Sequence, residues 1–113
     1  MEASNYAVAL RQLERWKEAR RLLRNTIPVA RRVLGDGHEL TLRMKKIYAD
    51  VLYRNTAATL DDLREAVTTL EETERTTRRV FGSAHPLTAT IERDLQTARA
   101  GLRAHETPSP GHS

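Results

Sequence analysis

The sequence contains no cysteine. Disulfide bonds and thiolate metal sites are therefore excluded, and nothing indicates an oxidising compartment. No run of about 18 apolar residues is present, so the sequence predicts no membrane-spanning helix and no membrane partner. The first ten residues, MEASNYAVAL, carry an acid and no lysine or arginine, which does not fit a secretory signal. We therefore expect a cytoplasmic protein.

Aromatic residues are scarce, at 4% of the chain, and apolar residues make up only 39%, whereas 30% are charged. This composition favours helices with narrow apolar stripes over a sheet with buried strands. The formal net charge of +4 favours acidic partners. The chain has no dense basic run and few aromatic platforms, so we do not expect nucleic acid as the partner, although a basic helical repeat that binds it stays open as an alternative.

An internal repeat organises the chain. Segment 16–44 aligns with segment 63–91 at an offset of 47 residues, with 11 identities in 29 positions. Average residue usage would give roughly two identities by chance. Upstream, Tyr6–Leu10 aligns with Tyr48–Leu52 at an offset of 42. The second unit therefore carries a five-residue insertion between Leu52 and Leu63.

Apolar residues within each unit recur at helical spacing. They predict an all-α fold of about five helices. The first is short, with Tyr6, Ala7 and Leu10 on one face, and is followed by a turn at QLER, residues 12–15. The second carries an apolar stripe: Ala19, Leu22, Leu23, Ile27, Ala30, Val33 and Leu34. The other three span about Glu39–Arg54, Asp61–Phe81 and Pro86–Ala104.

Two local features refine this prediction. Pro28 lies inside the second helix, where we expect a kink near residues 24–28 and not a helix end, because the apolar stripe continues in phase. The fourth helix needs a residue that caps its N-terminus, for which Thr59 and Asp61 are candidates.

Two histidines recur at equivalent positions, His38 and His85, and raise the question of a metal site. Stacked repeats would hold them roughly 10 Å apart, too far to share an ion at about 2 Å. The structural interpretation is that Gly35 and Gly82 each end a helix in the left-handed conformation and that each histidine lies at the start of the next helix. No phosphate loop, serine elbow or paired acid in a pocket is apparent. We therefore expect no metal, no cofactor and no enzyme.

Helical units of this length resemble tetratricopeptide repeats, and more narrowly the subclass with repeats of about 42 residues found in kinesin light chains. The residues that carry the resemblance are RRVLGDGHELT and RRVFGSAHPLT, with Ala7/Leu10, Ala49/Leu52, Glu18-Ala19 and Glu65-Ala66. The resemblance implies an α-α superhelix of helical hairpins over residues 1–104. Repeat one would cover about 3–38, repeat two about 39–85 with its insertion, and a capping helix about 86–104. Residues 105–113 are expected to form a disordered tail.

The resemblance also implies a function, namely a protein-interaction scaffold that binds a peptide or partner protein through its concave face. Mapping by register gives these candidate residues: Asn5, Arg11, Arg43, Lys46, Asp50, Tyr53, Arg54 and Arg93. Their positive bias suggests an acidic peptide, although basic residues could also be a plain solvated surface.

Two units and one further helix are few for such an array, so we expect either a longer array or a homo-oligomer formed through the uncapped N-terminal end. A purely structural or self-association segment stays open as a further alternative.

Overall fold

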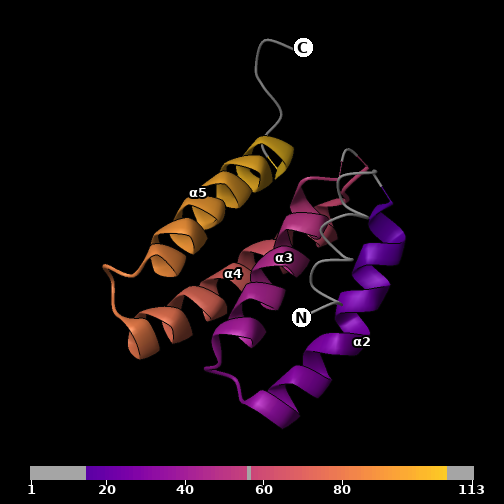
Figure 1. Cartoon of the computed structure of the whole chain (residues 1–113). Coiled ribbons are helices and arrows are strands. Elements are labelled where there is room, and N and C mark those ends of the chain that lie inside the picture. Colours follow the sequence, from indigo (N-terminus) through magenta and orange to yellow (C-terminus); the bar gives the residue numbers. More distant parts are fainter. Residues whose placement is uncertain (1–14, 56, 107–113) are drawn as a thin grey trace, which may run out of the picture.

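The computed structural model describes residues 15–55 and 57–106 and is all-helical there. Its helices are α2 (Trp16–Leu34), α3 (Glu39–Tyr53), α4 (Leu60–Phe81) and α5 (Pro86–Glu106), shown in Figure 1. The predicted fold class is confirmed, while the short first helix lies outside the described residues. Helix α5 continues two residues past its predicted end at Ala104, through His105 and Glu106. None of the helices in this part of the chain is long and apolar enough to cross a membrane.

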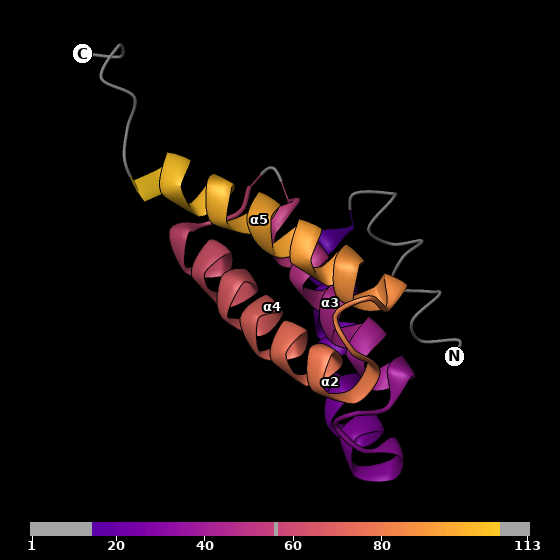
Figure 2. The same cartoon turned by 90° about the vertical axis from the view of Figure 1, so that its left-hand side faces the viewer.

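Helix α3 lies at the centre of the arrangement. It packs against α2, α4 and α5, and α4 also packs against α5, as Figures 1 and 2 show. By contrast, no Cα atom of α2 lies within 8 Å of one in α4. The hairpin of α3 and α4 therefore meets α2 through α3 and meets α5 mainly through α4, and α2 and α4 stand apart on one side of α3.

The core repeats with the sequence. Ala19 and Ala66 are both fully buried, as are Leu23 and Leu70 in the next turn of α2 and α4. The small alanine side chains allow the helices to approach closely, and the leucines fill the space between them. Equal burial at positions 47 residues apart confirms that the two units share one packing pattern.

Val33 departs from the predicted stripe. Its side chain is 71% exposed, whereas Ala30, one turn earlier, is buried. Three residues of helix rotate a side chain by about 300°, so Val33 lies roughly 60° away from the buried side of α2. The apolar character of a residue at the margin of a stripe does not by itself predict burial.

The two turns after α2 and α4 have the same construction. Gly35 has φ 99° and ψ 157°, and Gly82 has φ 89° and ψ 163°. The predicted left-handed conformation is wrong, because ψ is extended, although this region is also one that essentially only glycine adopts. Nδ1 of His38 accepts a hydrogen bond from the backbone N–H of Leu40 at 3.1 Å, and His85 accepts one from Leu87 at 3.0 Å. The recurring histidines therefore cap the following helices.

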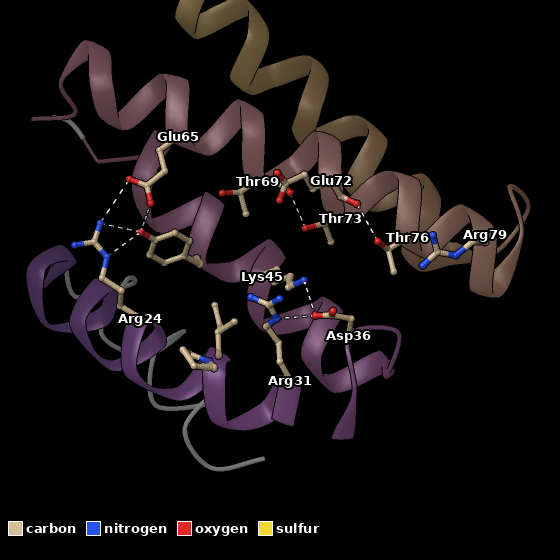
Figure 3. Close-up of a pocket in the computed structure, with 13 residues that line it drawn as sticks. Arg24, Arg31, Asp36, Lys45, Glu65, Thr69, Glu72, Thr73, Thr76 and Arg79 are labelled. Atoms are coloured by element: carbon tan, nitrogen blue, oxygen red, sulfur yellow. Dashed lines mark hydrogen bonds and ion pairs between the residues drawn. The ribbon is translucent and has the colours of Figure 1, made fainter. Parts of the chain in front are cut away.

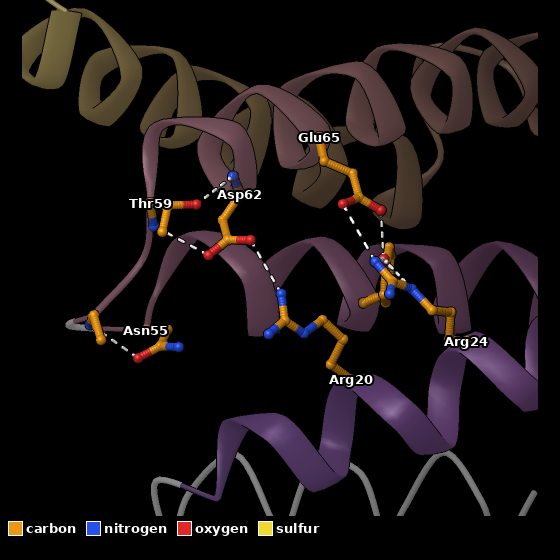
Figure 4. Close-up of polar contacts among 8 residues, drawn as sticks. Arg20, Arg24, Asn55, Thr59, Asp62 and Glu65 are labelled. Atoms are coloured by element: carbon orange, nitrogen blue, oxygen red, sulfur yellow. Dashed lines mark hydrogen bonds and ion pairs between the residues drawn. The ribbon is translucent and has the colours of Figure 1, made fainter.

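The lengthened turn between α3 and α4 is held by side chains at both ends. The Asn55 carboxamide accepts a hydrogen bond from the N–H of Ala57 at 3.0 Å. Of the two predicted candidates, Thr59 is the cap: its hydroxyl accepts from the N–H of Asp62 at 3.1 Å, and the Asp62 carboxylate accepts from the Thr59 N–H at 3.0 Å. Asp62 also accepts a hydrogen bond from Arg20 of α2 at 3.0 Å (Figure 4). The insertion thus ends in a capping box that is also tied to the preceding repeat.

Helix α2 is continuous through Pro28, which confirms that the proline does not end it. Pro28 has no N–H, so the carbonyl of Arg24 lacks its usual helical donor. The bend expected near this point stays a prediction.

Candidate functional site

Six of the eight predicted site residues lie in the described part of the chain, whereas Asn5 and Arg11 lie outside it. Arg43, Lys46, Asp50 and Tyr53 are on α3, Arg54 follows its last residue, and Arg93 is on α5. The structure brings three of them together with a residue that was not predicted, Asp94 of α5.

These four residues form an ion-pair cluster between α3 and α5. Nζ of Lys46 lies 3.1 Å from Oδ2 of Asp50 and 2.9 Å from Oδ2 of Asp94. The Arg54 guanidinium approaches the same two carboxylates at 3.6 and 3.8 Å. Two cations thus face two carboxylates, and the cluster as a whole carries no formal net charge.

Burial within the cluster is uneven. The side chains of Asp50 and Asp94 are only 5% and 8% exposed, whereas Lys46 is 20% and Arg54 44% exposed. A carboxylate that leaves water needs a cation and hydrogen bonds to remain ionised at acceptable cost. The cations of α3 and its C-cap therefore neutralise the two buried acids, which joins the first helices of successive hairpins.

Tyr53 lies beside this cluster. The Arg54 guanidinium lies 5.0 Å from the centroid of the Tyr53 ring. The Tyr53 hydroxyl is buried without a hydrogen bond of good geometry. Burial, reinforced by the negative charges of Asp50 and Asp94, raises the pKa of Tyr53 well above its usual value. The phenol is therefore neutral at ordinary pH, and its ring offers an apolar surface that ends in one polar atom, the hydroxyl oxygen.

Arg43 and Arg93 stand outside the cluster. Nε of Arg43 donates to Glu39, four residues earlier on α3, at 3.0 Å, and the Arg43 side chain is 51% exposed. Arg93 is exposed, and no residue in 15–55 or 57–106 forms an ion pair with it. Of the predicted cations within residues 15–55 and 57–106, Arg93 is thus the one most available to a ligand, and Arg43 is held by an exposed pair of little strength.

Asp94 escaped the sequence analysis, although a signal for it exists. It lies three residues after Ile91 and four before Ala98, on the face that buries both. An acid in an apolar stripe predicts a buried carboxylate, and such a carboxylate requires a cationic partner. The sequence pattern does not say which cation on which helix supplies it.

The described residues contain no group of three or more histidine, aspartate or glutamate side chains that could hold a metal ion. His38 and His85 are engaged as helix caps. The geometry in this part of the chain is that of a packed helical scaffold with charged outer faces.

Comparison with known proteins agrees with this geometry. Residues 1–57 match the family described as tetratricopeptide repeat. No curated protein and no solved structure gave a significant match. Tetratricopeptide repeats generally mediate protein–protein interactions, and theirs is a scaffold family without catalytic activity of its own. With half of its length matched and its helices paired as hairpins, the chain belongs to the tetratricopeptide repeat family.

Proposed function

We propose that this protein is an interaction scaffold whose partner protein or peptide docks on the face formed by α3 and α5, the concave face. The observation that carries the proposal is the cluster of Lys46, Asp50, Arg54 and Asp94, which fixes α3 to α5 by ion pairs at 2.9 to 3.8 Å. A surface held in this way is ordered before the partner arrives, so less entropy is lost on binding. Solenoids of helical repeats use such extended concave surfaces for recognition.

The chemistry of this face favours an extended peptide with an acidic residue. Lys46 and Arg54 are engaged by buried carboxylates, so they position the surface and contribute little free charge. Arg93 has no such partner among the described residues, and the exposed pair of Arg43 with Glu39 can be exchanged at small cost. The carboxylate of a ligand would therefore pair first with Arg93 and then with Arg43.

Within the family, the proposal assigns the repeats to the kinesin light chain-like subclass. The two signatures RRVLGDGHELT and RRVFGSAHPLT support it, because each builds the same glycine turn and histidine cap. The corresponding division is repeat one at about 3–38, repeat two at about 39–85 and a capping helix from about 86.

The test is selection of peptides from a display library against the full chain, followed by affinity measurements with variants. We expect Arg93→Ala to weaken the affinity for the selected peptide about tenfold, which corresponds to the loss of roughly one charge-assisted contact. Arg103→Ala is the matched control, since Arg103 is also exposed on α5. Equal affinities for wild type and Arg93→Ala would refute the assignment of this face. Lys46 and Arg54 are unsuitable for the test, because their removal also disturbs the packing of α3 on α5.

A second observation concerns the outer ridge of α2 and favours a longer array. Val29 is 45% and Val33 71% exposed. At the position equivalent to Val33, Val80 of α4 lies against the turn before α3, since a Cβ added at Gly37 would lie 3.1 Å from its Cγ2. Repetition of this contact would place a similar turn on Val33. The proposal is therefore that another helical hairpin covers this ridge, supplied in the isolated chain by a second copy.

Sedimentation tests this part. We expect a concentration-dependent dimer that the double change Val29→Ser and Val33→Ser abolishes. Val80→Ser, a similar substitution on α4, should leave the dimer intact. A monomer at all concentrations would overturn self-association through α2.

A further inference from the structure

A cleft separates α2 from α4 on the side of α3 that carries Lys45 and Tyr48 (Figure 3). Its volume is about 470 Å³. Lys45 and Lys46 are consecutive on α3, yet one lines this cleft and the other joins the cluster with Asp94. The cleft is therefore distinct from the concave face proposed above.

One end of the cleft is closed by side chains that satisfy each other. The Arg24 guanidinium donates to the Tyr48 hydroxyl from Nε at 3.2 Å and from a terminal nitrogen at 3.0 Å. The Tyr48 hydroxyl donates to Glu65, whose carboxylate also lies 3.5 Å from Arg24. Figure 3 shows Arg24 of α2 and Glu65 of α4 at this end, and the hydroxyl of Tyr48 on α3 bonds to both of them. One cation and one carboxylate balance here, so this end offers no free charge.

The other end carries an excess of cations. Arg31, Lys45 and Arg79 line it, one from each of three helices, and Asp36 is the carboxylate among them. Oδ1 of Asp36 accepts from Nε of Arg31 at 2.7 Å and lies 3.5 Å from Nζ of Lys45. Arg79 is exposed and has no ion-pair partner within 15–55 or 57–106. With Glu72, which lines the cleft nearer its middle, three cations face two carboxylates, which leaves one positive charge in excess.

Asp36 also shows which chemical group this end accepts. Its carboxylate accepts a hydrogen bond from Arg31, and this contact is the main cause that lowers the pKa of Asp36 below its usual value. Asp36 lies in the turn between α2 and α3, and its side chain is 56% exposed. An incoming carboxylate can therefore join it, or replace it, without opening the core.

The walls between the two ends suit a short extended chain. Ile27 and Pro28 supply an apolar wall on α2, and Thr69, Thr73 and Thr76 line the opposite side. From Arg24 to Arg31 the helix rises about 10 Å, at roughly 1.5 Å per residue, which matches about three residues of extended peptide. A single small ion would leave most of this length empty.

We propose that the cleft between α2 and α4 binds a short extended acidic peptide segment, with one carboxylate placed among Arg31, Lys45 and Arg79. Glu72 lies at the middle of the same cleft and would repel a peptide that carries carboxylates along its whole length. It therefore favours a peptide whose carboxylate binds at the Arg79 end. The protein would then have two recognition surfaces, on opposite sides of α3.

The experiment uses the full chain and a fluorescein-labelled six-residue peptide with a single glutamate among glutamines at low salt, with hexaglutamine as the uncharged probe. Asp36→Asn should tighten binding of the single-glutamate peptide by about two- to fivefold, because it frees Arg31 and Lys45 from an exposed competing carboxylate. Arg31→Gln and Arg79→Gln should each weaken binding by a similar factor. A gain of affinity in Asp36→Asn cannot arise from misfolding.

Matched controls distinguish binding in the cleft from attraction to the overall positive charge of the protein. Arg32→Gln and Arg75→Gln remove the same charge from the same two helices, and both residues are exposed and do not line the cleft. They should bind the single-glutamate peptide like the wild type. Equal weakening by Arg32→Gln and Arg31→Gln, no gain in Asp36→Asn, or equal affinity for hexaglutamine would overturn the proposal. Tighter binding of a single-stranded oligonucleotide, lost in Arg79→Gln, would overturn it in favour of nucleic acid.

Discussion

Nζ of Lys46 on α3 lies 2.9 Å from Oδ2 of Asp94 on α5. This contact joins two helices that are separated in sequence by the whole of α4. The same ammonium group also holds Asp50 at 3.1 Å, so one lysine serves two nearly buried carboxylates. We infer that this arrangement fixes α3 against α5 on the proposed concave face.

Asp94→Asn should destabilise the protein by about 1–3 kcal/mol, because it leaves Lys46 and Arg54 with one carboxylate between them. The loss is smaller than for a fully buried pair, since Arg54 is 44% exposed and can turn into solvent. Urea unfolding followed by circular dichroism measures the change.

Asp61→Asn is the control for this prediction, because the Asp61 side chain is 94% exposed and should change stability by less than about 0.5 kcal/mol. The double variant Lys46→Met with Asp94→Leu should recover much of the loss, since an apolar pair can replace a buried ion pair. An Asp94→Asn variant as stable as the wild type would show that the cluster adds nothing to stability.

The glycine turns give a second prediction. Gly82→Ala should cost about 1–3 kcal/mol, since φ of 89° with an extended ψ is open essentially to glycine alone. Space is not the cause, because a Cβ at Gly82 meets nothing within 4 Å. Gly101→Ala, inside the exposed part of α5, should instead stabilise by about 0.5–1 kcal/mol. Thermal unfolding of the two variants should move the midpoint in opposite directions, and a shift in the same direction would contradict the assigned backbone geometry.

The capping box of α4 gives a third prediction. Thr59→Ala removes the acceptor of the Asp62 N–H and should cost about 1 kcal/mol. Thr68→Ala changes an exposed threonine inside the same helix and should be neutral or slightly stabilising, because alanine is the better helix former. Equilibrium unfolding of the two variants compares them directly. Equal stability would mean that the lengthened turn does not depend on its cap.

The buried phenol of Tyr53 predicts a pH effect. Its pKa is raised above 10.0 in the folded protein, mainly by burial and then by Asp50 and Asp94. The unfolded chain therefore releases this proton first as pH rises, and folded stability falls above about pH 10. Urea unfolding at about pH 9 and about pH 11 should show a larger loss for the wild type than for Tyr53→Phe. The same loss in both proteins would mean that Tyr53 titrates alike in the folded and unfolded states.

Much of the fold could be predicted from the sequence repeat itself. Segments 47 residues apart share glycine, histidine and apolar positions, and the structure gives them the same turn, the same cap and, at Ala19/Ala66 and Leu23/Leu70, the same burial. These are local relations, set by residues a few positions apart. Val33 shows the limit, because burial at the margin of a stripe depends on a neighbour that no local pattern specifies.

The candidate site was harder to predict from the sequence, because its chemistry depends on pairs of residues that are distant in sequence. The alignment of the two repeats placed Lys46 and Arg54 on one surface. It could not show that Asp94, 40 or more residues away, neutralises them. The cleft between α2 and α4 was missed for the same reason: Arg31 and Arg79 look like solvated helix ends until three helices bring them to one hollow with Lys45.

The most direct test of the proposed function is amide chemical-shift mapping by NMR with a display-selected peptide bound to the full chain. We predict that the largest changes cluster on α3 and α5 around Arg93, Arg43 and the Lys46–Asp94 pair. Changes confined to α2 and α4, or scattered over the basic surface without a focus, would contradict the claim that the concave face is the site at which this scaffold recognises its partner.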